Sequence, residues 1–364
     1  MMAEVARYVP VAGGLLVLAA LLQQYERLAA LAANSSACVK LRARATSWLV
    51  AISGTSESLT RLPIVEKVAP NVIRVLGLNP GRMTLQGTNT YLVGTGRSRI
   101  LVDTGDGSNA YLATLLAVLA AEDIESISDI VLTHGHFDHI GGVWQLQERF
   151  PRARVWKMLT YTPTPPCECS AHVSNTYASR KLHIRDLSEL ISQGQALTTD
   201  GASLRPLYTP GHTNDHVCFV LNGTAIFTGD CVLGEGTCTF QSLTEYMMSL
   251  RVLQAQAPTR LYPGHGPVIE NAADTIAMYL AHRQKREDEI LAVLNAQGRA
   301  NVTTIVAAMY PSLPWMLSIA AARNVRMHLR KLVDEKAVVE TSPEWSWVSW
   351  HPAPVYALAT TTAK

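Results

Sequence analysis

The sequence has no strong excess of charge of either sign and no pairing pattern among its cysteines. Its formal net charge is +2 over 364 residues, so any case for a polyanionic partner must rest on local basic clusters. The cysteines form no spaced framework, and the pair at 167 and 169 has no second pair to complete a zinc ribbon. We therefore expect reduced thiols at Cys38, Cys167, Cys169, Cys218, Cys231 and Cys238.

Charged residues are scarce overall, and the chain contains no repeat of fixed period. Charged side chains make up 16% and hydrophobic ones 48% of the sequence. This balance excludes a largely disordered protein and allows a large buried core. A chain of this length accommodates one catalytic domain with smaller additions.

Residues 1–60 lack a full membrane span and, over much of their length, acidic side chains. The apolar run from Val9 to Leu22 is shorter than the roughly 20 residues that cross a bilayer, and no acid occurs from Arg27 to Ser56. A basic, acid-poor, helical stretch is typical of a mitochondrial presequence. We therefore predict an N-terminal extension over 1–60 and a mitochondrial location. The alternatives are a cytosolic location, a secretory signal, or membrane association through residues 9–22.

The patterning from residue 68 to 272 predicts an α/β domain. Short apolar and β-branched runs bounded by Gly, Pro or Asn predict strands, and the stretch from Leu112 to Ala121 predicts a helix. Residues of metal-ligand type follow several of these strands directly, where α/β proteins place their sites. The strand candidates are residues 72–76, 89–93, 100–103, 130–132, 155–156, 204–208, 217–221 and 225–227.

Residues 273–350 read as helices followed by short strands. A helix pair followed by a β-ribbon predicts a winged-helix-like module. Residues 351–364 carry no structural signal and are expected to be a frayed tail. The expected elements are helices over 276–294, 303–310 and 319–332, and strands over 337–339 and 345–350.

The segment Thr133-His134-Gly135-His136-Phe137-Asp138-His139 places four side chains of metal-ligand type directly after an expected strand. Imidazole nitrogen suits zinc, and a nearby carboxylate suits a second metal position. A loop with this spacing can direct its first two histidines to one ion and the Asp-His pair to another. A lone histidine is more often structural, but seven such residues after successive strands predict a two-metal site. The remaining ligand candidates, each in a glycine-flanked turn, are His212, Asp230 and His265.

These motifs resemble those of the metallo-β-lactamase superfamily, whose first motif is similar to Leu101-Val102-Asp103-Thr104-Gly105. The resemblance implies an αββα sandwich and two zinc ions per chain. It implies that Asp230 bridges the ions and that Asp103 orients ligands. The implied ligand sets are His134, His136 and His212 for one zinc, and Asp138, His139 and His265 for the other.

A closer resemblance, over about residues 68–350, is to the β-lactamase-like protein 2 group. It rests on Asn79-Pro80-Gly81, on the stretch from Thr84 to Tyr91, on Gly229-Asp230-Cys231, on the stretch from Leu233 to Thr237, and on that from Tyr262 to Ile269. The best-known members of the group are mitochondrial endoribonucleases that cleave single-stranded RNA. Two features depart from it: Gly135 replaces what is more often a bulky aromatic residue, and segment 160–195 is peculiar to this chain.

The expected reaction is hydrolysis by a zinc-bridging hydroxide, with Asp138 essential to it. This chemistry serves phosphodiesters and thioesters alike, so the motifs specify the reaction type and not the substrate. We expect an endoribonuclease acting on single-stranded RNA. The alternatives are a thioester hydrolase, either glyoxalase-II-like or a polyketide carrier-protein thioesterase, and a nucleic-acid-binding protein without catalysis. The short spacing from His212 to Asp230 excludes nucleases with a large domain inserted there.

Two basic clusters are candidate RNA contacts. Arg323, Arg326, Arg330 and Lys331 share one side of an expected helix, where RNA binding and a solvated face are equally open readings. Arg283, Lys285 and Arg286 precede three acids, so a solvated helix face is the preferred reading there. Asn89 is a candidate substrate contact or a structural turn residue. His216 is expected to be structural, and Trp345, Trp347 and Trp350 are expected to pack the terminal ribbon.

Overall fold

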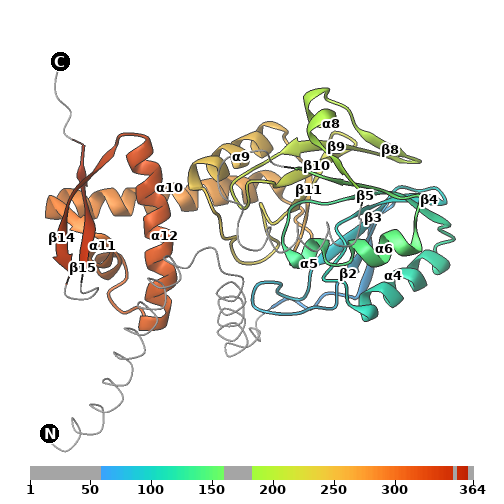
Figure 1. Cartoon of the computed structure of the whole chain (residues 1–364), viewed down its shortest axis with the longest axis horizontal. Helices are drawn as coiled ribbons and strands as arrows, with labels where there is room; N and C mark the ends of the chain where they lie inside the picture. The colour runs from blue at the N-terminus through green and yellow to red at the C-terminus, as the bar shows by residue number, and fades with distance from the viewer. Residues whose placement is uncertain (1–58, 160–182, 347–350, 360–364) are drawn as a thin grey trace, which may run out of the picture. The chain divides into compact units, whose positions relative to one another are not determined.

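The structure is a computed structural model that describes residues 59–159, 183–346 and 351–359 (Figure 1). The described residues from 59 to 341 and from 355 to 359 belong to one compact unit. Most of the predicted N-terminal extension lies outside the described residues, as do Cys38, Cys167 and Cys169. Within the described ranges, no helix is long and apolar enough to cross a membrane.

A seven-stranded sheet forms the first half of the α/β domain. Its order follows the chain from β1 to β7. The first four strands pair antiparallel, whereas β4 to β7 run parallel. The strands are β1 (Val65–Ala69), β2 (Val72–Leu76), β3 (Asn89–Val93), β4 (Ser98–Val102), β5 (Ser126–Val131), β6 (Arg154–Lys157) and β7 (Ile184–Asp186).

A second sheet of five strands has the order β12-β11-β10-β9-β8. Strands β11 and β12 are parallel, and the other pairs are antiparallel. The strands are β8 (Leu197–Thr199), β9 (Ala202–Tyr208), β10 (Val217–Leu221), β11 (Ala225–Gly229) and β12 (Arg260–Pro263).

The two sheets face each other across a shared core, because alternate residues of a strand point to opposite faces. Tyr91 and Val93 pack inward with Phe219 and Phe227 of the second sheet, whereas Leu92 packs outward against helices. Helices α4 (Asn109–Ala121) and α6 (Val143–Arg149) cover the first sheet, and α9 (Leu243–Ala255) and α10 (Ala272–Gln297) cover the second (Figure 1). The expected αββα sandwich is confirmed. Two short helices, α5 (Phe137–Ile140) and α8 (Ser188–Ser192), lie in connections.

The C-terminal part has its own core and is the expected winged-helix module. Helices α10, α11 (Val302–Met309) and α12 (Trp315–Asp334) pack together through Leu294, Ile305 and Leu329. They are joined by a sheet of order β13-β15-β14. Its strands are β13 (Arg299–Asn301), β14 (Val338–Ser346) and β15 (His351–Leu358).

The predicted frayed tail from residue 351 is wrong for its first part. Strand β15 occupies His351–Leu358, and residues 355–357 pair with β13. Tyr356 packs on the C-terminal core. The local sequence contains Pro352 and Pro354 and carries no strand signal, because the pairing partner lies more than fifty residues earlier in the chain.

Candidate metal centre

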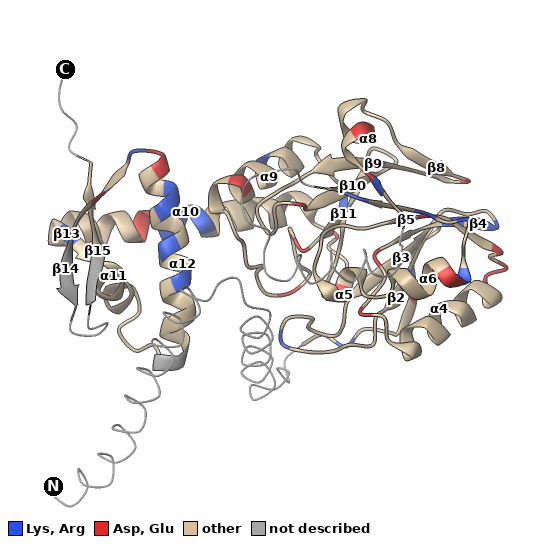
Figure 2. Cartoon of the chain, viewed as in Figure 1, with Lys and Arg blue, Asp and Glu red and all other residues tan. Residues whose placement is uncertain are grey.

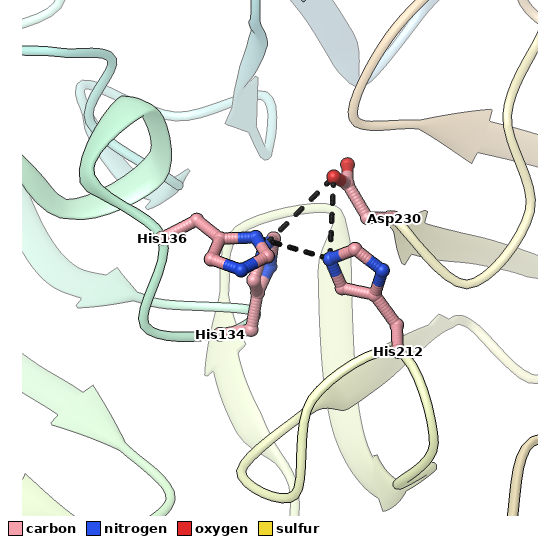
Figure 3. A group of neighbouring side chains, drawn as sticks. All are labelled: His134, His136, His212 and Asp230. Carbon is pink, nitrogen blue, oxygen red and sulfur yellow. Dashed lines mark hydrogen bonds and ion pairs between the residues drawn. The ribbon is translucent and has the colours of Figure 1, made fainter. Parts of the chain in front are cut away.

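Four of the predicted ligands meet between the ends of β5, β9 and β11. His134 and His136 follow β5, His212 follows β9, and Asp230 follows β11. His136 Nδ1 lies 2.8 Å from His134 Nε2 and 3.1 Å from His212 Nε2 (Figure 3). Asp230 Oδ2 lies 3.5 Å from His212 Nε2 and 3.9 Å from His134 Nε2. One candidate ligand atom from each residue therefore faces a common point.

Asp138, His139 and His265 form a second group next to the first. The Asp138 Oδ2 atom lies 3.2 Å from His139 Nε2 and 3.3 Å from His265 Nε2. Asp230 connects the groups, because its other oxygen, Oδ1, lies 3.4 Å from His139 Nε2 and 3.2 Å from His265 Nε2. The structure thus brings all seven predicted ligands together, with the two oxygens of one carboxylate facing different groups.

The donor set fits metal cations. Tetrahedral ligands at about 2.0–2.2 Å from zinc are separated by roughly 3.4 Å, which is close to most of these spacings. His212 Nδ1 donates to the Thr239 carbonyl at 2.7 Å, and His139 Nδ1 donates to Asp103 Oδ2 at 2.8 Å. Each Nε2 is therefore the ring nitrogen left to face the other ligands. Two unprotonated ring nitrogens at such distances repel each other, so either a shared proton or a bound cation must lie between them.

The pKa shifts in the first group favour the protonation states in which histidine and aspartate bind metal ions. Burial lowers the pKa of His134 well below its usual value, and it lowers the pKa of His212 to about 3. Burial alone would raise the pKa of Asp230, but the imidazoles of His265 and His139 lower it well below the usual range. The first group therefore presents neutral imidazoles and an ionised carboxylate.

In the second group, carboxylates outweigh burial. Burial alone would lower the pKa of His139, but Asp138, Asp230 and Asp103 raise it well above its usual value. The pKa of His265 rises to about 9, since Asp230 and Asp138 outweigh its burial. This surplus of negative charge around two imidazoles is the field that a bound cation would neutralise.

Several residues hold the ligands in place. Asp103 is buried, and its Oδ1 accepts from the Thr133 backbone N–H at 2.8 Å. Its Oδ2 accepts from the Thr133 hydroxyl as well as from His139, so it ties the end of β5 to a ligand ring. Asp103 has φ 58°, a left-handed conformation that is uncommon for a non-glycine residue. His216, expected to be structural, accepts from the Asp230 backbone N–H at 3.2 Å.

Three readings of the sequence are corrected by the structure. Asn89 is buried, and its amide donates to the carbonyls of Pro263 and Gly266, so of the two roles left open for it the structure supports the structural one, in strand β3 and not in a turn. Lys331 is buried and forms ion pairs with Glu287 and Glu335, so it is not one of the exposed basic residues that could contact RNA. Arg283 is also buried, so the second cluster is not simply a solvated face. The sequence carried no signal for these, because each depends on a partner from another element.

Arg323, Arg326 and Arg330 are exposed on α12. Figure 2 shows basic residues along this helix, and none of the seven candidate ligands belongs to it. No acidic residue occurs in this helix before Asp334. The trio therefore forms an exposed cationic row on the C-terminal part of the chain.

Other side chains at the centre were missed from the sequence. Thr88 donates from Oγ1 to Asp138 Oδ2 at 2.9 Å. Phe137, between two ligands, is 63% exposed, which makes it an aromatic surface beside the centre. Gly135 is next to the buried Lys157–Asp215 ion pair, and a Cβ there would lie 2.8 Å from Asp215 Oδ2. A side chain at this position would therefore press on the ion pair, which is consistent with glycine where the resembling group more often has a bulky aromatic residue.

Comparisons with known proteins cover both parts of the chain. Residues 83–265 match the metallo-beta-lactamase superfamily, and residues 302–347 match the beta-lactamase associated winged helix domain. A beta-lactamase-like protein 2 homolog from Drosophila melanogaster is 40% identical over 295 residues, which is 80% of this chain and 98% of that protein. The homolog from Caenorhabditis elegans is 38% identical over 298 residues, 80% of this chain and 94% of its own.

A relative with a different name is comparably similar. The atrochrysone carboxyl ACP thioesterase of Aspergillus fumigatus is 39% identical over 275 residues, 72% of this chain and 81% of that protein. Among solved structures, a beta-lactamase domain protein from Burkholderia ambifaria has a TM-score of 0.65 at 20% identity, covering 84% of this chain and 97% of its own. A metallo-beta-lactamase family protein from Thermus thermophilus has a TM-score of 0.56 at 23% identity, with 80% and 100% covered. These two structures support the fold alone.

Proposed function

The chain belongs to the metallo-beta-lactamase superfamily, and we propose that it is a two-zinc hydrolase that cleaves single-stranded RNA. The observation that carries the two-metal part is Asp230, whose Oδ2 faces one histidine group and whose Oδ1 faces the other. A buried carboxylate placed in this way suits two cations better than one. The chemistry of the donors, imidazole nitrogen with carboxylate oxygen, favours zinc.

In the proposed enzyme, two bound zinc ions would supply activation of water and stabilisation of negative charge on the substrate. His134 and Asp103 are almost completely buried, whereas the Asp138 side chain is 24% exposed. Substrate therefore approaches from the side of Asp138 and His136, next to the exposed ring of Phe137. Thr88 holds Asp138 through its hydroxyl and so keeps the carboxylate directed at His139 and His265.

Two features favour RNA as the substrate. The exposed row Arg323, Arg326 and Arg330 can pair with backbone phosphates, and Phe137 can stack on a base beside the metal centre. The similarity to beta-lactamase-like protein 2 homologs supports the resemblance to that group, which implies single-stranded RNA as the substrate. The acid-poor extension supports a mitochondrial location as part of this proposal.

A thioesterase is the second candidate, and the similarity to the carrier-protein thioesterase of Aspergillus fumigatus favours it. The same metal centre would serve a thioester carbonyl, which also builds up negative charge on an oxygen during attack. The two candidates differ in what they require of α12, because a thioester needs no row of phosphate contacts.

The test is cleavage of an end-labelled single-stranded RNA and of an acyl-pantetheine thioester by the full chain loaded with zinc. Asp138→Ala removes a ligand of the second group, and Asp274→Ala, an exposed acid on α10, is the matched control. We expect RNA cleavage by wild type and Asp274→Ala and none by Asp138→Ala. Thioester hydrolysis without RNA cleavage would establish the second candidate. Neither activity, in protein shown to hold two zinc ions, would contradict both.

A further inference from the structure

The metal ligand His212 depends on a segment that precedes α9. Its Nδ1 donates to the Thr239 carbonyl at 2.7 Å, so the backbone at residues 238–240 sets the orientation of the imidazole ring. Partners of this kind determine which ring nitrogen faces a metal and how basic it is. Whatever holds residues 238–240 in place therefore also acts on the metal centre.

Arg283, a residue of helix α10, contacts residues 238 and 240 of this segment. It is 3% exposed, and its guanidinium donates to the Cys238 carbonyl at 3.2 Å. The guanidinium carbon also lies 4.9 Å from the centre of the Phe240 ring and 5.7 Å from that of Tyr246. Residues 238 and 240, on both sides of Thr239, are thus fixed by one side chain through a hydrogen bond and a cation–π contact.

Helix α12 completes the support. The buried His328 ring lies edge-on to Phe240 at 6.3 Å, and Phe240 stacks on Tyr246 at 5.5 Å. One turn beyond Arg283, the buried Glu287 accepts from Lys331 of α12 at 2.9 Å. Helices α10 and α12 therefore both contact Phe240, through Arg283 and His328, and the Glu287–Lys331 ion pair joins the two helices next to these contacts.

We propose that Arg283 is a positioning residue of the metal centre, acting on His212 through residues 238–240. The C-terminal helices are then part of the support of the active site, in addition to any role in binding substrate. This inference rests on the metal binding proposed above. It differs from a purely structural anchor in one respect: loss of Arg283 must weaken the ion held by His212 and leave the other ion little changed.

The experiment measures zinc stoichiometry and affinity in the full chain by competition with a chromophoric chelator, together with the visible spectrum of the Co²⁺-substituted protein. Arg283→Met keeps the aliphatic length but removes the hydrogen bond and the charge. Arg283→Lys keeps a charge and a donor. Lys285→Met removes a charge from an exposed position on the same helix and is the matched control.

We expect wild type to bind two ions, and Arg283→Met to bind one of them roughly 10- to 100-fold more weakly, as for other groups that orient a ligand. The Co²⁺ spectrum should change with it, Arg283→Lys should recover part of the affinity, and Lys285→Met should match wild type. If Arg283→Met does not fold, Phe240→Leu, which removes the ring beneath the guanidinium, should weaken the same ion.

Unchanged affinity and spectrum in a folded Arg283→Met, with only a lower unfolding midpoint, would overturn the inference and leave the proposed function standing. Equal weakening of both ions would also overturn it. Wild type that binds no metal would overturn the proposed function itself.

Discussion

Phe137 stands between two ligands of different groups, His136 and Asp138. Its ring is largely exposed although large aromatic side chains are usually buried. It is the first residue of the short helix α5, so the backbone that positions Asp138 and His139 also places this residue beside the centre. An exposed aromatic ring beside a reaction site is suited to stacking on a planar part of a substrate.

We expect Phe137→Ala to raise KM for single-stranded RNA by about 5- to 150-fold, because one base–aromatic stack contributes roughly 1–3 kcal/mol. Metal content and kcat should change little, and Phe137→Trp should retain the wild-type KM. Steady-state kinetics on a labelled oligonucleotide make the measurement, with Met278→Ala, at an exposed position on α10, as control. An unchanged KM in Phe137→Ala would rule out stacking at this position.

Helix α12 has one face that packs into the C-terminal core and another that carries exposed arginines. Val325, Leu329 and Leu332 pack into the C-terminal core, whereas Arg323, Arg326 and Arg330 are exposed. Spacings of three and four residues bring the three arginines to one side of the helix. Among the described residues none of the three has an ion-pair partner, so their charges are available to a phosphate backbone.

Replacing these three arginines with glutamine should weaken RNA binding uniformly across sequences. Each phosphate contact on a single strand contributes about 0.7 to the slope of log affinity against log salt, so the slope should fall by about 2. Zinc content should stay the same. Fluorescence anisotropy over a salt series gives the slope. The same charge loss at the exposed residues Arg149, Arg152 and Arg251 is the control, and an equal effect there would mean that α12 has no special role.

The contact between α10 and α12 predicts a dependence of stability on pH. Burial alone would raise the pKa of Glu287, but His328 and Lys331 lower it below its usual value of 4.5. A carboxyl with a depressed pKa stabilises the fold above its unfolded pKa, and this stabilisation is lost as the pH falls through the folded pKa. Glu287 therefore contributes most near neutral pH.

The difference in unfolding free energy between wild type and Glu287→Gln should be constant above about pH 4.5 to 5 and should shrink as the pH falls further. Urea denaturation at a series of pH values measures it. Glu148→Gln, at an exposed position, should show no such trend. A difference that stays constant down to about pH 3 would show that the ion pair does not shift the Glu287 titration.

The protein as a whole should be held together partly by its metals. The seven ligands come from both sheets, so ions bound among them would cross-link the two halves of the sandwich. A ligand that binds only the folded state adds stability that grows with its free concentration over Kd, about 4 kcal/mol at roughly 1,000-fold excess.

Removal of metal by a chelator should therefore lower the unfolding midpoint of wild type by several degrees, and zinc should restore it. The loss should be smaller in Asp230→Ala, which lacks the residue that faces both groups. Thermal unfolding with and without chelator makes the comparison. An identical midpoint in both conditions would mean that the centre contributes nothing to folding.

The metal centre could be recognised from the sequence because its ligands lie in short glycine-flanked segments after strands. His134, His136, Asp138 and His139 lie within six residues, so their proximity needs no tertiary information. The sandwich could be recognised for a related reason: alternating apolar residues indicate each strand, and ligands at successive strand ends require those ends to meet.

The supporting residues could not be recognised in this way. Asn89, Arg283 and Lys331 are polar residues whose partners lie on other elements, and residues 355–357 pair with a strand far back in the chain. The composition of a local stretch shows whether a side chain can ligate, donate or carry charge. Whether it meets water or a buried partner depends on which distant segments pack against it, and only the folded chain decides that.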